Sequence, residues 1–263
     1  MIANKAKPGL RRLLAVLAFL ALSRPAGAGE GDGLVFLKPN GHHYAPYHAD
    51  EAPTEGQGGW LALVREKDGW HLRETSFQAE RARDELLDYE GEPPTGVIIH
   101  SREYPESFAL LRHPALKAGA VEGPETLWEP AAEPDLHPQL PPRRQLHSFR
   151  LAGRDYWLEL WRHDYGYSTT TTPDKLFLNS SAPPERQLLP EDFRTDEDNW
   201  PVNVAVKNIW IGDLDGDNLP DFIIWNTGYN HDRHCLYLST VSPPAADGAL
   251  PTPTACHLMI TGC

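Results

Sequence analysis

Residues 208–225 read NIWIGDLDGDNLPDFIIW, and this stretch decides the fold class. Two runs rich in β-branched and aromatic residues lie on either side of a loop that contains four aspartates. Short runs of this composition, bounded by Gly, Asn, Asp and Pro, are typical of β-strands joined by a turn. The stretch therefore predicts a strand, an acidic loop at residues 213–221, and a second strand that returns from the loop.

Outward from this stretch, the chain continues to favour antiparallel strands. Residues 60–65 and 70–77 flank an Asp-Gly step at residues 67–69, which is a strong signal for a β-hairpin. Residues 147–151 and 156–162 predict a second hairpin with a glycine-containing turn. The 25 Pro and 21 Gly residues favour many turns and few long helices. We expect a mainly β protein of antiparallel sheets and hairpins.

The distribution of proline divides the chain into two small halves. Residues 121–146 contain six prolines, which break regular elements and suit an exposed connection. This Pro-rich stretch is predicted to link an N-terminal β region, residues 29–120, to a C-terminal β region, residues 147–263. Within the N-terminal region, residues 79–90 fit either a short helix or a charged edge strand, and the sequence does not distinguish the two.

The acidic loop carries oxygen donors at the spacing of a calcium site. Aspartates stand at loop positions 1, 3, 5 and 9, and a main-chain carbonyl at position 7 is placed to join them. Calcium takes six to eight oxygen ligands, and carboxylates packed this closely repel one another unless a cation lies between them. Asn218 stands at position 6, where the backbone must be left-handed and Asn is the best substitute for Gly. The expected ligands are Asp213, Asp215, Asp217, Leu219 and Asp221.

The loop departs from an EF-hand, because position 12 is Ile224 where an EF-hand has a bidentate Glu. The sequence GDLDGD at residues 212–217, followed by PDFII at residues 220–224, resembles the calcium loop of FG-GAP and VCBS-type repeats, which occur in series in exported β-propellers and adhesins. The resemblance implies that the four aspartates bind Ca²⁺ through their side chains and Leu219 through its carbonyl. A single copy implies a local calcium site and no propeller. The alternative is an acidic turn that binds no metal.

The N-terminus, residues 1–28, has the pattern of a secretory signal peptide. Basic residues precede an apolar run at residues 13–22, which is too short to span a bilayer, and small residues follow at 25–28. Cleavage after Ala28 removes five of the 24 basic residues and none of the 37 acidic ones, which leaves a net charge of −18. Such a surface repels phosphate backbones, so nucleic acid is not an expected partner. We expect a periplasmic or secreted protein with no membrane span after cleavage.

Three cysteines, Cys235, Cys256 and Cys263, lie near the C-terminus. An exported protein is in an oxidising compartment, where one disulfide is expected. If residues 235–241 and 255–262 pair as antiparallel strands, Cys235 lies opposite Cys263, and this pairing is favoured over the other two.

Two further groups of metal-capable side chains occur in the sequence. His231, His234 and Cys235 fit either part of a zinc site or an ordinary polar hairpin loop. His42 and His43 lie in a Gly- and Pro-rich segment that is typical of a loop.

The chain contains no G-x-S-x-G elbow, H-E-x-x-H helix, phosphate-binding loop or dinucleotide fingerprint. The preferred hypothesis is therefore an exported, non-enzymatic protein with one calcium-stabilised loop, such as a binding or adhesion module for a protein or carbohydrate ligand. The alternative is a secreted or periplasmic hydrolase whose catalytic residues are dispersed. A deep pocket with convergent carboxylates or histidines favours the hydrolase, and an exposed aromatic patch favours the binding module.

Overall fold

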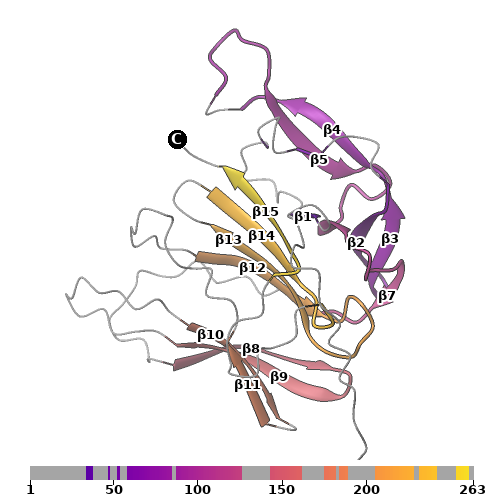
Figure 1. Cartoon of the computed structure of the whole chain (residues 1–263), viewed down its shortest axis with the longest axis vertical. Helices are drawn as coiled ribbons and strands as arrows, with labels where there is room; N and C mark the ends of the chain where they lie inside the picture. The colour runs from indigo at the N-terminus through magenta and orange to yellow at the C-terminus, as the bar shows by residue number, and fades with distance from the viewer. Residues whose placement is uncertain are drawn as a thin grey trace, which may run out of the picture.

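A computed structural model of the chain describes residues 34–37, 47, 52–53, 58–84, 87–125, 143–161, 175–181, 184–188, 205–227, 231–241 and 253–260. Within these ranges the chain forms four antiparallel sheets and no helix (Figure 1). The predicted mainly β, antiparallel fold is confirmed. None of the described residues belongs to a helix long and apolar enough to cross a membrane.

A five-stranded sheet forms the centre of the N-terminal region. Its strands, in spatial order, are β1 (Leu34–Leu37), β6 (Ala109–Arg112), β2 (Trp60–Glu66), β3 (Gly69–Thr75) and β7 (Gly119–Val121). Strands β2 and β3 form the predicted hairpin, and the last pair of their ladder joins the end of β2 to the start of β3. The turn therefore lies where the Asp-Gly step of the sequence places it.

Both faces of β2 are buried. Leu61 and Leu63 belong to a core cluster that also contains residues of the C-terminal region. Trp60 and Val64 belong to a second cluster on the opposite face. Because successive side chains of a strand point to opposite faces, a strand that is apolar on both sides must lie in an inner layer.

Strands β4 (Phe77–Ala82) and β5 (Gly96–Ser101) pair as a two-stranded sheet whose buried residues share the second cluster with β2. The segment 79–90, for which the sequence left two conformations open, continues strand β4 as far as Ala82 and has no helix in its described part. In Figure 1 this hairpin and its connecting loop project from the rest of the molecule.

Two four-stranded sheets make up the C-terminal region. The first has the order β11-β10-β9-β8 and the second the order β12-β13-β14-β15. The bounds of these strands are β8 Arg143–Leu151, β9 Arg154–Trp161, β10 Lys175–Ser181, β11 Pro184–Leu188, β12 Ala205–Gly212, β13 Asp221–Thr227, β14 His231–Tyr237 and β15 Ala255–Ile260.

The β12–β15 sheet is a second inner layer. Ile211 and Ile224 pack with residues of β8, β9 and β10, whereas Trp210 and Ile223 pack with residues of β2 and β3. This explains why the runs that flank the acidic loop are continuously apolar, since neither face of these strands meets water. Figure 1 shows the β12–β15 sheet between the N-terminal sheets and the β8–β11 sheet.

The Pro-rich stretch is described only at its two ends, and strands extend into both. Strand β7 ends inside it at Val121, and β8 begins inside it at Arg143. Trp70 donates its indole N–H to the carbonyl oxygen of Pro124 (2.8 Å), and the ring of Trp70 packs edge-on against Trp210 with centroids 6.0 Å apart. The beginning of the stretch therefore lies against residues of both halves.

A disulfide joins Cys235 to Cys256, whose Cα atoms are 4.2 Å apart. The predicted pairing of Cys235 with Cys263 is therefore wrong. Strand β14 ends at Tyr237 and β15 begins at Ala255, and their antiparallel register places Cys235 directly opposite Cys256. The strand limits expected from the sequence differ from these, and a change of register changes which residues face each other. Cys263 lies outside the described residues.

Candidate metal site

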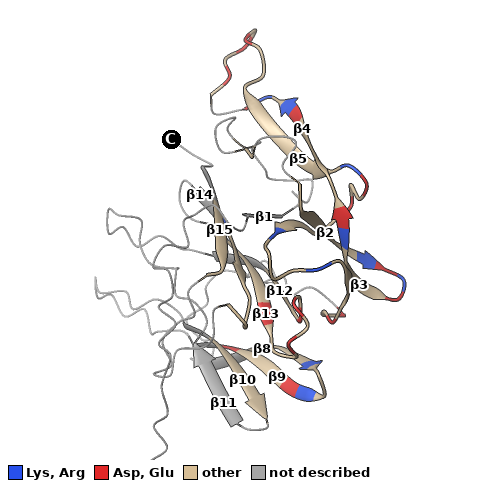
Figure 2. Ribbon diagram, turned by 45° about the vertical axis from the view of Figure 1, so that its right-hand side comes forward, with Lys and Arg blue, Asp and Glu red and all other residues tan. Residues whose placement is uncertain are grey.

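The acidic loop connects β12 to β13, and the pair formed by Gly212 and Asp221 closes it. Gly216 and Asn218 have φ angles of 83° and 67°, so the loop turns through two left-handed residues. Asn218 stands at loop position 6, for which a left-handed backbone is predicted from the sequence. The side chain of Leu214 is buried in the shared core and anchors the loop to it. Figure 2 shows acidic residues in red at the end of the sheet where β13 begins.

Asp213 holds the loop from within. Its carboxylate accepts hydrogen bonds from the main-chain N–H groups of Gly216 (2.7 Å), Asp217 (3.1 Å) and Asn218 (3.0 Å). Its own main-chain N–H donates to the carbonyl oxygen of Glu122 (2.8 Å), through an isolated bridge from the end of β7. Asp213 therefore fixes the loop's shape and connects it to the N-terminal half.

Asp221 is fully buried beneath the loop, with 0% of its surface exposed. It accepts hydrogen bonds from the N–H groups of Leu214 (2.6 Å) and Asp215 (3.3 Å), and from both the N–H (2.8 Å) and the hydroxyl (3.1 Å) of Ser239. Burial raises the pKa of Asp221 to about 7, although the N–H of Ser239 opposes the shift. Near neutral pH this carboxyl group is poised between its protonated and ionised forms.

Asp215 and Asp217 lie closer to the surface. Asp215 accepts a hydrogen bond from the hydroxyl of Thr240 through Oδ2, while its Oδ1 is buried and has no hydrogen-bond partner. Burial also raises the pKa of Asp215. Asp217 accepts from the hydroxyl of Ser239 (2.6 Å) and from the N–H of Leu219 (2.8 Å). An unpaired buried carboxylate oxygen is costly, so Asp215 has the most to gain from a nearby cation.

Three of the five predicted ligands converge. Carboxylate oxygens of Asp213, Asp215 and Asp221 lie within 4.8 Å of one another, and such a group could hold a metal ion. Asp217 lies outside this group of three, with its carboxylate held by Ser239. The side chain of Leu219 is exposed, and its carbonyl remains a predicted ligand.

Two residues that contact the loop carboxylates were not predicted from the sequence. Ser239 and Thr240 follow the end of β14, and their hydroxyls reach three of the loop aspartates. Two adjacent hydroxyl residues after a predicted strand are a signal that the sequence contains. Only the pairing of β13 with β14, however, brings the end of β14 to the acidic loop.

The predicted group of His231, His234 and Cys235 lacks a thiolate, because Cys235 is in the disulfide. His234 is buried, and burial lowers its pKa to about 3. Its ring packs edge-on against that of Trp225, with centroids 5.5 Å apart. The side chain of His231 lies outside the described residues, as do His42 and His43.

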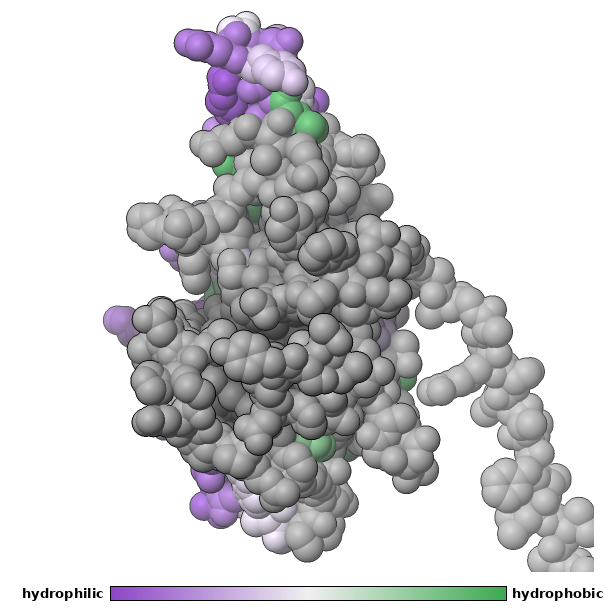
Figure 3. Space-filling view, turned by 90° about the vertical axis from the view of Figure 1, so that its left-hand side faces the viewer, coloured by the Kyte–Doolittle hydropathy of each residue, from purple (hydrophilic) through white to green (hydrophobic). Residues whose placement is uncertain are grey.

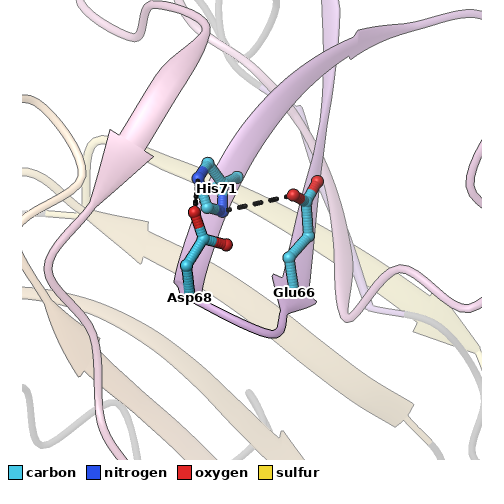
Figure 4. Close-up of side chains that lie close together, drawn as sticks. All are labelled: Glu66, Asp68 and His71. Atoms are coloured by element: carbon cyan, nitrogen blue, oxygen red, sulfur yellow. Dashed lines mark ion pairs between the residues drawn. The ribbon is translucent and has the colours of Figure 1, made fainter.

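A second group of metal-capable side chains lies at the β2–β3 turn and was also missed. Glu66, Asp68 and His71 each offer one ligand atom, and these three atoms lie within 4.8 Å of one another (Figure 4). The hairpin prediction alone places Glu66 and His71 near the same turn. The orientation of the imidazole toward the carboxylates depends on how β3 packs in the core.

No protein-family model matches the chain, and neither a curated protein nor a solved structure is significantly similar to it.

Proposed function

We propose that the acidic loop binds one calcium ion, and that the protein acts outside the cytoplasm as a non-enzymatic binding module stabilised by that ion. The unpaired, buried Oδ1 of Asp215, beside the carboxylates of Asp213 and Asp221, is the observation that supports this most directly. A cation at this point would give that oxygen a partner and would favour the ionised form of Asp221.

The donor atoms favour calcium over other metals. The group consists of carboxylate oxygens alone, with no imidazole or thiolate, and hard divalent cations prefer oxygen. Calcium tolerates irregular coordination and can take further oxygens from Asp217, the carbonyl of Leu219 and water. Magnesium demands a nearly ideal octahedron and keeps more of its water.

A calcium ion here would act as a structural link. The loop contacts the end of β7 through Glu122 and the end of β14 through Ser239. The carboxylate of Glu122 also accepts a hydrogen bond from the N–H of Ala152 (3.1 Å), in the β8–β9 turn. An ion that stiffens the loop therefore stabilises a point where segments of three sheets meet, and its binding free energy adds to the stability of the folded state.

An extracytoplasmic location follows from the signal-peptide pattern of residues 1–28, which lie outside the described residues. Calcium sites of extracellular modules can bind as weakly as about 10⁻⁴–10⁻³ M and still be filled.

The binding role would belong to the projecting β4–β5 loop. Asp88 fastens this loop by accepting hydrogen bonds from the N–H (3.0 Å) and the hydroxyl (2.5 Å) of Thr95, while Leu87 and the 76%-exposed Tyr89 face outward. Figure 3 shows mostly hydrophilic residues at this end of the molecule. An exposed aromatic ring among polar groups suits a carbohydrate or a polar protein surface. Binding to an array of glycans, compared between Tyr89→Ala and the unmodified protein, tests this role; equal binding would exclude Tyr89 from it.

Thermal unfolding with calcium and with a chelator tests the calcium site. At a calcium concentration about 50-fold above Kd, binding stabilises the folded state by about 2 kcal/mol. For a chain of this size we expect Tm to rise by about 5 °C. The variant Asp215→Asn keeps the shape of the side chain but removes its charge, and should lose most of this rise.

The matched control is Asp155→Asn, which changes an exposed aspartate of β9 far in sequence from the loop. It should keep the full calcium response. If the unmodified protein shows neither bound calcium nor a change in Tm, the calcium proposal is wrong. If Asp215→Asn responds as the control does, the ion binds elsewhere.

A further inference from the structure

The β2–β3 hairpin gathers three side chains of different chemistry at its turn. Glu66 is the last residue of β2, Asp68 lies in the turn, and His71 is the third residue of β3. Figure 4 shows the imidazole of His71 facing both carboxylates. The set combines one nitrogen donor with two oxygen donors, in contrast to the all-oxygen set of the acidic loop.

His71 is the buried member of this group. Its side chain is 9% exposed, and its Nδ1 is buried with no hydrogen-bond partner. Nδ1 lies 3.9 Å from an oxygen of Glu66, and Nε2 lies 3.7 Å from an oxygen of Asp68. Both separations are too long for hydrogen bonds. The buried Nδ1 is thus directed toward the carboxylate of Glu66, which does not satisfy it, at a cost that a bound ion would remove.

We propose that Glu66, Asp68 and His71 form a zinc site. Zinc binds imidazole nitrogen and carboxylate oxygen at about 2.0–2.2 Å in tetrahedral geometry, so two ligands of one ion lie about 3.3 Å apart. One ion binds only one ring nitrogen of His71. Nδ1 lies 3.9 Å from an oxygen of Glu66, and one ligand atom from each of the three residues lies within 4.8 Å of the others, so side-chain rotations must bring the three donors closer together. The side chain of Asp68 is 75% exposed, so the fourth position opens to solvent and is filled by water.

Arg73 prepares one of the ligands. Its guanidinium donates two hydrogen bonds to the carboxylate of Glu66, at 2.8 and 2.7 Å, and these fix the orientation of that carboxylate. Each oxygen of Glu66 keeps a lone pair for a metal beside its hydrogen bond with Arg73. The positive charge of Arg73 offsets the negative charge of Glu66, which weakens the attraction of the site for calcium. The imidazole of His71 favours a transition metal such as zinc.

Zinc titration of the purified, untagged protein in excess calcium tests the site. Calorimetry gives the stoichiometry and the affinity. Asp68→Asn removes a ligand at an exposed turn position that Asn also favours, so the variant folds normally. It should lose one zinc ion per chain, or bind that ion at least about 10-fold more weakly.

Glu66→Gln provides a second ligand variant and should show the same loss. Glu74→Gln, at an exposed position of the same strand, is the matched control and should bind zinc as the unmodified protein does. Zinc bound by other histidines appears equally in all four proteins, so the difference between them isolates the turn. Unchanged zinc binding in Asp68→Asn and Glu66→Gln would overturn the proposal, as would an equal loss in Glu74→Gln.

Discussion

The acidic loop and the β2–β3 turn each join two antiparallel strands, yet they hold their carboxylates in opposite ways. In the loop, Asp213 and Asp221 are buried and surrounded by main-chain N–H groups. In the turn, Glu66 and Asp68 are exposed, and a guanidinium neutralises Glu66. Burial raises the pKa of Asp221, whereas the hydrogen bond with Arg73 lowers that of Glu66.

The difference separates two kinds of dependence on a metal ion. Main-chain N–H groups only partly offset the cost of burying the carboxylates of the loop. A cation is therefore needed to favour their ionised form. The turn carries its own counter-charge in Arg73, so its exposed carboxylates depend less on an ion than those of the loop do. We therefore expect the loop to govern the stability of the whole fold and the turn to have little effect on it.

The largest effect is expected for Asp221→Ala. The substitution leaves the N–H groups of Leu214 and Ser239 without their acceptor and removes a proposed calcium ligand. We expect the free energy of unfolding in calcium to fall by roughly 4 kcal/mol, measured by urea denaturation. The loss should be smaller in chelator, because there the buried charge itself is a cost. Equal losses in calcium and chelator would show that Asp221 acts through its hydrogen bonds alone.

A smaller effect is expected where the loop meets the N-terminal half. A Cβ at Gly212 would clash with the carbonyl oxygen of Glu122 and the ring of Trp210, so Gly212→Ala should destabilise the fold by about 2–3 kcal/mol. The paired variant is Gly216→Ala, where a Cβ meets open space and only the φ of 83° opposes it. It should cost about 1 kcal/mol in the same urea experiment. If Gly216→Ala costs more, the bridge to Glu122 is less important than the turn.

The smallest effect is expected on the pH dependence of the free energy of unfolding. His234 and His257 face each other across β14 and β15, and burial lowers their pKa values to about 3 and about 4. Between these values and the ordinary pKa of His the folded state binds fewer protons than the unfolded state, so stability falls as pH falls. From pH 7 to pH 6 the two histidines together should remove about 1 kcal/mol.

Asp221 acts with the opposite sign in chelator, because its raised pKa makes the folded state bind more protons as pH falls. The measurement is therefore the difference in urea stability between the unmodified protein and the double variant His234→Phe, His257→Phe, at both pH values. The unmodified protein should lose more stability than the variant. Parallel pH dependence would mean that the histidines are protonated in the folded state or that acid opens this sheet only locally.

Much of the fold class and part of the site followed from local sequence. The Asp-Gly step predicted the position of the β2–β3 turn. The spacing of the aspartates identified Asp213, Asp215 and Asp221, whose carboxylates converge in the structure. Residues 79–90 stayed ambiguous, because a short charged segment has no strong periodicity and its partner β5 decides its conformation. The disulfide was mispredicted for a related reason. The limits and register of β14 and β15 decide which residues face each other, and local sequence does not fix that register.

The sequence by itself determined the strand–loop–strand order around the acidic loop and the left-handed residue Asn218, because alternation and backbone preference act between near neighbours. Tertiary structure alone decided that Cys235 meets Cys256, that Ser239 reaches Asp221, and that His71 is buried beside two carboxylates. These contacts depend on sheet order and register, which are fixed by apolar packing on both faces of the inner sheets, between residues distant in sequence.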